Sequence, residues 1–195
     1  MTLPHLLVII AVALSITGSS VYIRDTIKGK TKPNLVSWSM WALAPLISTC
    51  VAISAKADLW ATARVFFAGF LPLLVVIIAL INPKSYWKLT LFDLLCGACS
   101  FLAIIVWAYL GLAKSAIILA LLGDCFALFP TLKKAWQNPE TESGLTYFAG
   151  FISSILIIPS IPRFDIENSA FQIYLIIANA LLFLAVYKRT LKLFK

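Results

Sequence analysis

Long apolar segments alternate with short polar segments along the whole chain. Each apolar segment is close to the length of about 20 residues that a helix needs to cross the hydrocarbon core of a bilayer. The pattern predicts seven membrane-spanning helices, at residues 4–23, 35–54, 61–82, 89–111, 115–131, 144–162 and 169–187. We therefore expect an all-α polytopic membrane protein.

Composition agrees with a protein whose solvent is lipid. Of the 195 residues, 62% are hydrophobic and only 12% are charged, whereas about 25% of the residues of a typical soluble domain are charged. No Lys or Arg precedes the first apolar segment, although a secretory signal peptide begins with a positively charged region. We therefore expect the first segment to be a retained helix.

The net charge of +8 at first suggests a nucleic-acid partner, but the cations lie mainly in the short segments between the apolar ones. If seven helices alternate in direction, twelve of the sixteen Lys and Arg residues lie on one side of the membrane, and the other four are Lys56, Arg64, Lys114 and Arg163. Loops rich in Lys and Arg stay in the cytoplasm. We therefore predict a protein of the inner or plasma membrane, with its N-terminus outside, its C-terminus in the cytoplasm and no nucleic-acid partner.

Two stretches of the chain resemble each other. Gly18-Ser19-Ser20 aligns with Gly123-Asp124-Cys125, and Ser37-Trp38 aligns with Thr146-Tyr147 after a slightly longer second loop. The alignment relates the first two predicted helices to the fifth and sixth, with the same direction through the membrane.

The repeat predicts an architecture of two parallel three-helix bundles. The first bundle takes residues 1–85, the second takes residues 114–195 with a short basic tail, and a single linker helix lies within residues 86–113. Parallel repeats related by an axis along the membrane normal are a known plan of secondary transporters.

One motif points to a family. Phe129-Pro130-Thr131-Leu132-Lys133, followed by Glu142-Ser143, places a proline at the end of a bundle helix, then a basic loop, then a serine at the start of the next helix. With the 3+1+3 arrangement, these residues resemble the SWEET-type sugar transporters and the wider PQ-loop group. The chain departs from the group in two ways: Thr131 stands where glutamine follows the proline, and of the expected pair of asparagines only Asn179 is present.

The resemblance implies a transporter of a sugar or another small neutral or cationic solute, working by alternating access. Asp124 is the first candidate for contact with such a solute, because it lies about 10 Å inside the predicted hydrocarbon at a rise of 1.5 Å per residue. A charge at the centre of a membrane helix costs about 2.5–3.5 kcal/mol on insertion scales. Asp124 either faces a cavity, where it binds a cationic group or a proton, or is protonated and hydrogen-bonded to a neighbouring helix. Asn179 is the second candidate, since a mid-helix amide in lipid needs a partner.

Aromatic residues complete the candidate substrate site. Trp38, Trp41 and Tyr147 lie early in the segments 35–54 and 144–162. They can stack on a sugar ring or contact a cation, or they can anchor the helices at the membrane interface.

Prolines are the candidate hinges. Pro45, Pro130 and Pro159 lie inside or at the ends of predicted helices, where each removes an intrahelical hydrogen bond. The sequence leaves open whether they allow motion between bundles or only shape a static packing.

Motifs for catalysis or cofactor binding do not occur in the sequence. His5 is the single histidine, and the pair Cys96 and Cys99 lies inside a predicted helix without a second pair, so we interpret these cysteines as small packing residues. We expect no enzymatic activity, no cofactor and no metal site. The predicted partners are membrane lipid and a small-molecule solute, and a homo-oligomer is left open.

The alternative from another class is a receptor or adaptor of the same fold that binds a lipid or a protein and transports nothing. The basic end of the chain, residues 187–195, would then form a surface for lipid headgroups or for the partner. A transporter needs polar residues from both bundles around one cavity, whereas an adaptor does not.

Overall fold

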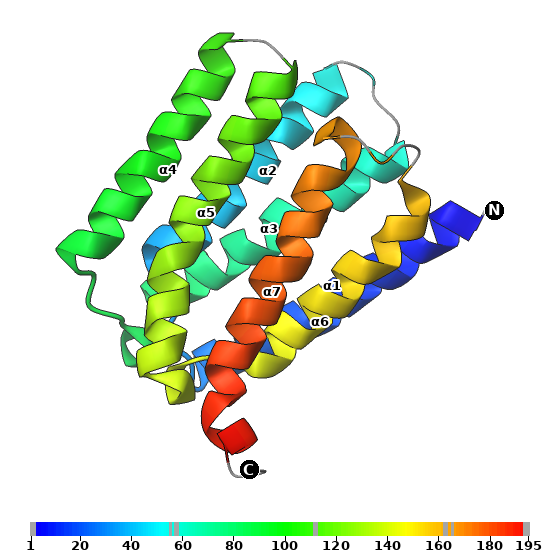
Figure 1. The fold of residues 1–195 in the computed structure, drawn as a ribbon. Coiled ribbons are helices and arrows are strands. Elements are labelled where there is room, and N and C mark those ends of the chain that lie inside the picture. Colours follow the sequence, from blue (N-terminus) through cyan, green and yellow to red (C-terminus); the bar gives the residue numbers. More distant parts are fainter. Residues whose placement is uncertain are drawn as a thin grey trace.

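The computed structural model describes residues 3–54, 56, 59–110, 113–161, 164 and 166–192; Arg163 and Lys195, which entered the count of cations, lie outside them. All regular structure within the described residues is helical (Figure 1), which confirms the all-α prediction. The longer helices are α1 (Leu3–Ile27), α2 (Leu35–Ser54), α3 (Leu59–Ile81), α4 (Leu91–Leu110), α5 (Ala113–Gln137), α6 (Gly144–Ile157) and α7 (Ile166–Lys192). Single 3-10 turns follow α3, α5 and α6, and they are η1 (Pro83–Ser85), η2 (Pro139–Thr141) and η3 (Ile158–Ser160).

Three helices, α5, α6 and α7, end five or six residues away from the points that the apolar pattern predicts. α5 continues past residue 131 to Gln137. Its last turns carry amphipathic Lys and Trp side chains, which allow the helix to continue outside the hydrocarbon. α6 ends at Ile157, and the chain tightens into η3 around Pro159, since a proline cannot donate the next helical hydrogen bond.

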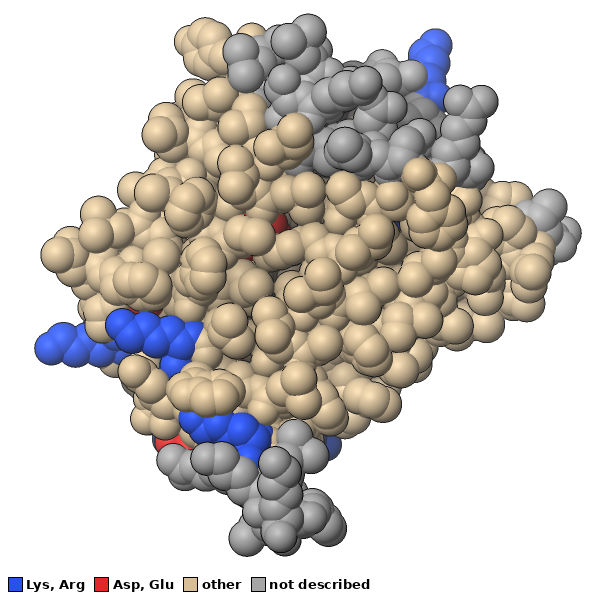
Figure 2. Space-filling model, viewed as in Figure 1, with Lys and Arg blue, Asp and Glu red and all other residues tan. Residues whose placement is uncertain are grey.

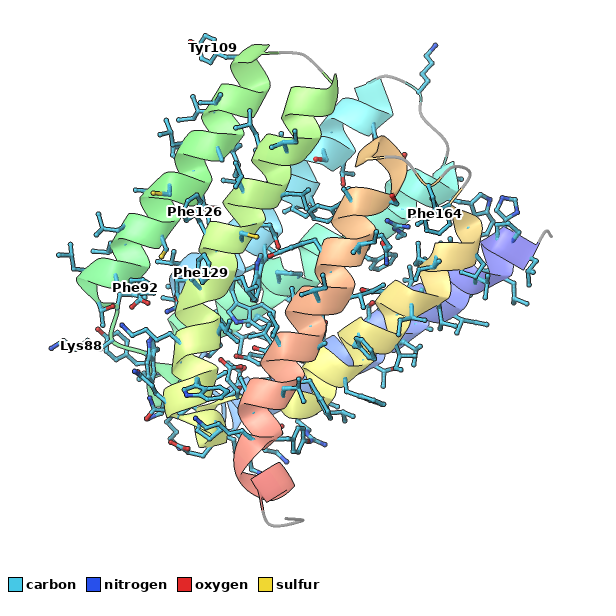
Figure 3. The ribbon with its side chains drawn as sticks, in the orientation of Figure 1. Lys88, Phe92, Tyr109, Phe126, Phe129 and Phe164 are labelled. Carbon is cyan, nitrogen blue, oxygen red and sulfur yellow. The ribbon has the colours of Figure 1, made fainter. Side chains whose placement is uncertain are left out.

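The described helices have the apolar character that a membrane requires. Three of them, Leu3–Ile27, Thr62–Ile81 and Ser169–Lys188, are long and apolar enough to cross a membrane. Large apolar side chains are exposed on the outside, and Figure 3 shows Tyr109 pointing outward at one end of α4. In the face drawn in Figure 2, most Lys and Arg side chains gather at the end where the C-terminus lies. This distribution is compatible with a membrane location.

Six helices form a closed ring. α3 packs against α1 and α2, which we call the first helix group, and α7 packs against α5 and α6, the second helix group. The groups meet where α1 packs against α6 and where α2 packs against α5. The pattern of helix contacts therefore stays the same when α1, α2 and α3 are exchanged for α5, α6 and α7. α4 lies outside the ring against α5 and α2, at one edge of the molecule in Figure 1.

Small residues bring α1 and α6 close together. A Cβ atom added to Gly18 would lie 2.7 Å from the Cβ atom of Ala149, which is too close for any real contact. The hydroxyl of Thr146 donates a hydrogen bond of 2.8 Å to the carbonyl of Gly18, and that of Ser153 donates one of 2.9 Å to the carbonyl of Ala11. Close approach of backbones at small residues is a common basis of helix association in membranes.

Replacement of Gly18 tests this contact. Gly18→Leu should lower the free energy of unfolding by about 1–3 kcal/mol, because the larger side chain overpacks the interface. Ala13→Leu is the matched control on the same helix, because Ala13 is exposed, and it should change stability by less than about 0.5 kcal/mol. Unfolding of the purified protein in detergent, followed by tryptophan fluorescence, measures both. Equal effects of the two variants would contradict the role given to Gly18.

Candidate functional site

A cavity of about 540 Å³ lies inside the ring of helices. This volume falls within the range of about 300–1,000 Å³ that is typical of small-molecule sites. All five candidate substrate residues and one candidate hinge contribute to its wall, namely Trp38, Trp41, Pro45, Asp124, Tyr147 and Asn179. Pro130 and Pro159 are not part of the wall. The structure thus brings residues of both helix groups to the wall of one cavity.

The aligned halves of the repeat occupy matching places around this cavity. Ser19 of α1 and Asp124 of α5, which the alignment pairs, both line it, and so do the aligned aromatic residues Trp38 of α2 and Tyr147 of α6. The aligned positions therefore line the same cavity, although the side chains themselves differ.

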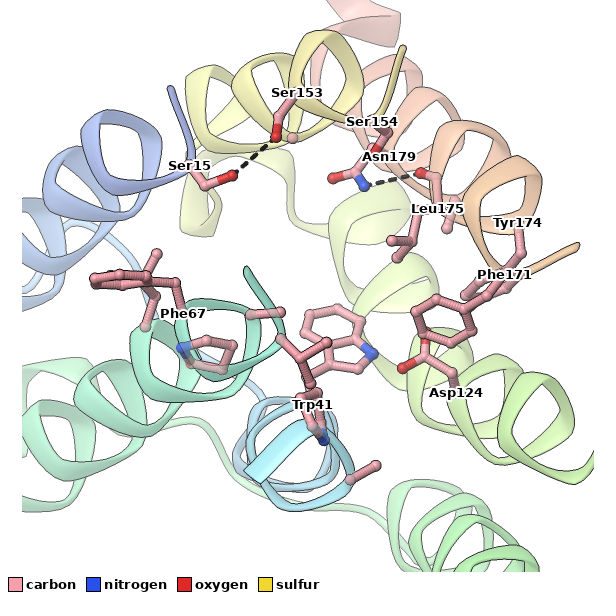
Figure 4. Close-up of a pocket in the computed structure, with 18 of the residues that line it drawn as sticks. Ser15, Trp41, Phe67, Asp124, Ser153, Ser154, Phe171, Tyr174, Leu175 and Asn179 are labelled. Atoms are coloured by element: carbon pink, nitrogen blue, oxygen red, sulfur yellow. Dashed lines mark hydrogen bonds between the residues drawn. The ribbon is translucent and has the colours of Figure 1, made fainter. Parts of the chain in front are cut away.

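The wall is mostly apolar. Trp41, Phe67 and Phe171 are among its aromatic residues (Figure 4). Among the described residues that line the cavity, only Arg64 of α3 and Asp124 of α5 are charged, and their charges are opposite.

Asp124 faces the cavity next to aromatic residues of α7. Figure 4 shows Asp124, Phe171 and Tyr174 together on one side of the pocket, across from Ser15 and Ser153. The Tyr174 hydroxyl lies beside Asp124 and is buried without a hydrogen-bond partner of good geometry in the part of the chain that the structure describes. No described residue forms an ion pair with Asp124.

Asn179 is held against α6 by a glycine. Its amide nitrogen donates a hydrogen bond of 2.8 Å to the carbonyl of Leu175 in its own helix. A Cβ atom added to Gly150 would lie 2.4 Å from the Asn179 Oδ1 atom, so Gly150 leaves the space that this side chain occupies. Asn179 therefore lines the cavity with its amide oxygen packed against Gly150.

Arg64 is a functional candidate that sequence reasoning missed. The sequence prediction counted it among four cations at the outer side, but its side chain lines the cavity from α3. Its Nη2 atom lies 3.4 Å from the Oε1 atom of Gln172, and the Gln172 amide donates to the carbonyl of Ser154 at 2.6 Å. The sequence did carry a signal, since Arg64 already lay inside the predicted helix 61–82.

A buried ionic cluster joins α1, α5 and α6. The Glu142 Oε1 atom lies 2.6 Å from the Lys134 Nζ atom, and both side chains are at most 1% exposed. The Glu142 Oε2 atom accepts hydrogen bonds from the hydroxyls of Tyr22 at 2.9 Å and Tyr147 at 2.7 Å. We call Tyr22, Lys134, Glu142 and Tyr147 the Glu142 cluster.

The Glu142 cluster lies directly beside the cavity wall and joins the two helix groups. Tyr147 belongs both to the cluster and to the wall. The Trp38 ring, also part of the wall, packs on Tyr22 with 4.5 Å between ring centroids. The Lys134 ammonium also donates to the carbonyl of Lys32, in the loop between α1 and α2. Contacts from the first helix group therefore converge on charged residues of the second.

Lys134 and Glu142 depend on each other because both are removed from water. Lys134 lies beyond the predicted span 115–131, and burial lowers the pKa of its ammonium while the Glu142 carboxylate acts in the opposite direction. The sequence prediction treated Lys134 only as one of the cations that set the orientation of the chain. Nothing in the sequence distinguished it from the exposed Lys133 beside it.

No group of three His, Cys, Asp or Glu side chains within the described ranges lies close enough together to hold a metal ion. Cys96 and Cys99 are both free thiols. Comparison of the chain with protein-family models, with curated proteins and with solved structures gave no match.

A substitution at Lys134 tests the cluster. Lys134→Met should lower the free energy of unfolding by about 3–5 kcal/mol, because it leaves the buried Glu142 carboxylate without its counter-ion. Lys133→Met is the matched control: its ammonium sits 4.4 Å above the Phe92 ring, and loss of such an exposed contact costs at most about 1 kcal/mol. Denaturant unfolding in detergent measures both, and a loss in Lys134→Met no greater than that of the control would contradict the assigned role.

Proposed function

We propose that this protein is a membrane transporter that moves a small solute by alternating access between its two helix groups. The observation that carries the proposal is the cavity between the groups, which residues of both groups line and whose mostly apolar wall contains Arg64 and Asp124. A transporter built from two repeated units binds its solute at the junction between them, whereas a receptor or adaptor needs no cavity at that place.

The proposed arrangement in the membrane has seven spans, with the N-terminus outside and the C-terminus in the cytoplasm. α2, α4 and α6 contain the shorter apolar stretches Leu35–Cys50, Leu91–Val106 and Gly144–Ser160. They lie beside the three longer apolar helices in the same helix assembly, so we place them in the same bilayer. This order is that of the SWEET-type and PQ-loop transporters that the sequence resembles.

In this proposal the structure corresponds to a state that is closed toward the cytoplasm. Opening on that side requires Tyr22 of α1 to separate from Glu142, because this hydrogen bond joins the first helix group to the second. Pro130 lies one turn before Lys134 inside α5. A proline there leaves the carbonyl of residue 126 without its helical donor, which allows the end of α5 that carries Lys134 to bend.

Asp124 is the proposed coupling residue for a proton or a cationic group. Its carboxylate lines the cavity without an ion-pair partner among the described residues. A charged residue in such a place within a membrane protein is by default a functional candidate.

Uptake into proteoliposomes tests the proposal. The purified protein should accumulate at least one radiolabelled solute from a panel of sugars, amino acids and amines, with saturable kinetics. Asp124→Asn should lower that uptake by at least about tenfold, as expected for loss of one charge-assisted contact. Glu140→Gln is the control, because Glu140 is exposed outside the cavity, and it should transport normally. Absence of uptake for every solute in the panel would count against transport.

A further inference from the structure

We infer that the solute is a zwitterion, with its anionic group bound by Arg64 and its cationic group bound by Asp124. The inference rests on the proposed function for what happens to the solute after binding. The binding step itself rests only on the cavity and on the two charged side chains that line it.

The charges of the cavity-lining residues match a zwitterion in number and sign. Arg64 and Asp124 are the two charged residues among the described cavity-lining residues, one of each sign. They come from different helix groups, since Arg64 belongs to α3 and Asp124 to α5. A molecule that contacts both therefore bridges the two groups.

Arg64 and Asp124 both lie next to α7. Arg64 contacts Gln172, and Asp124 lies beside Tyr174. These two residues of α7 are two positions apart, which is about 3 Å along the helix axis, and they point to nearly opposite sides of the helix. Phe171 lines the cavity on the same stretch of α7. Arg64 and Asp124 thus line the same cavity and lie next to two nearby positions of α7.

Neither Arg64 nor Asp124 has a counter-ion among the described residues. The contact of Arg64 is a neutral amide oxygen at 3.4 Å, which is long for a hydrogen bond. A charge withdrawn from water without a counter-ion is strongly unfavourable, so a bound solute that supplies both counter-ions gains from both sites.

A zwitterion fits this demand better than the other solute classes. A carboxylate can accept two parallel hydrogen bonds from the Arg64 guanidinium, while an ammonium can donate to Asp124. A sugar offers hydroxyls but leaves both charges without a counter-ion, and a simple amine or acid leaves one. The aromatic residues Trp41 and Phe67 line the remaining wall, so an apolar body between or beside the charged groups is favoured.

Matched solutes test the inference on the purified protein in detergent. L-leucine and 6-aminohexanoate are zwitterions with short and long charge separation. Their single-charge counterparts are isoamylamine and 4-methylpentanoate for the first, and hexylamine and hexanoate for the second. Isothermal titration calorimetry should show at least one zwitterion binding about tenfold or more tightly than both of its counterparts. D-glucose, the control for a sugar site, should bind more weakly than that zwitterion.

Variants assign the two ends of the solute. Arg64→Gln should weaken zwitterion binding by about 10- to 100-fold and leave amine binding no weaker, because only the carboxylate contact is lost. Asp124→Asn should weaken zwitterion binding similarly and leave acid binding no weaker. Arg64→Lys and Asp124→Glu retain the charges and should restore part of the affinity. Retention of the wild-type elution volume on size exclusion shows that a weakened variant is still folded.

The outcomes separate this inference from the proposed function. If neither zwitterion binds more tightly than its amine and its acid, the inference is wrong, even if a sugar or an amine is transported into proteoliposomes. If a zwitterion binds in the charge-dependent way described but is not taken up, the inference stands and the transport proposal fails. The wild-type titrations alone decide the first question, so failure of a variant to fold leaves the test intact.

Discussion

A single buried carboxylate joins the two helix groups. Glu142 is surrounded by one ammonium and two phenolic hydroxyls, and these come from α1, α5 and α6. In a medium that offers no water, each of these groups needs the others. The contact is therefore strong while it is intact, yet it is built from polar groups that water can replace once the helices separate.

The two helix groups are also held together by the packing of α1 on α6. Gly18 lets the two backbones approach closely, whereas the large side chains Trp38, Trp41 and Tyr147 project toward the interior. Small residues at the helix contact and large residues around the centre leave a space that the helices do not fill. The cavity thus results from the positions of small and large side chains along each helix.

The sequence was sufficient to predict the helices and part of the site. Helix formation in a bilayer depends on the length of apolar segments, which is a local property, so the predicted ends fall within a few residues for most helices. Asp124 and Asn179 could be singled out because one polar residue in an apolar segment is conspicuous. Their common cavity could not be predicted, because it depends on which faces of six helices meet.

Residues near helix ends were harder to interpret. Arg64 lies only five positions after the start of α3, so it resembled an interfacial charge, and only the direction of its side chain shows otherwise. Lys134 contacts Glu142 in a short loop that also contains the exposed Glu140. From the sequence, either Lys133 or Lys134 could pair with either of the two glutamates. The structure shows that the buried pair is Lys134 with Glu142.

The two helix groups make the same pattern of helix contacts, while their charged residues differ. In each group one helix packs against both others, and the groups meet through α1 with α6 and through α2 with α5. Trp38 and Tyr147, which the alignment pairs, are both aromatic residues of the wall, whereas the aligned Ser19 and Asp124 differ in charge. A zwitterion has two unlike ends, and a wall with the same charge in both groups would present the same charge to each end. A difference at the charged positions, with aromatic residues at the other paired positions, therefore suits the binding of such a solute.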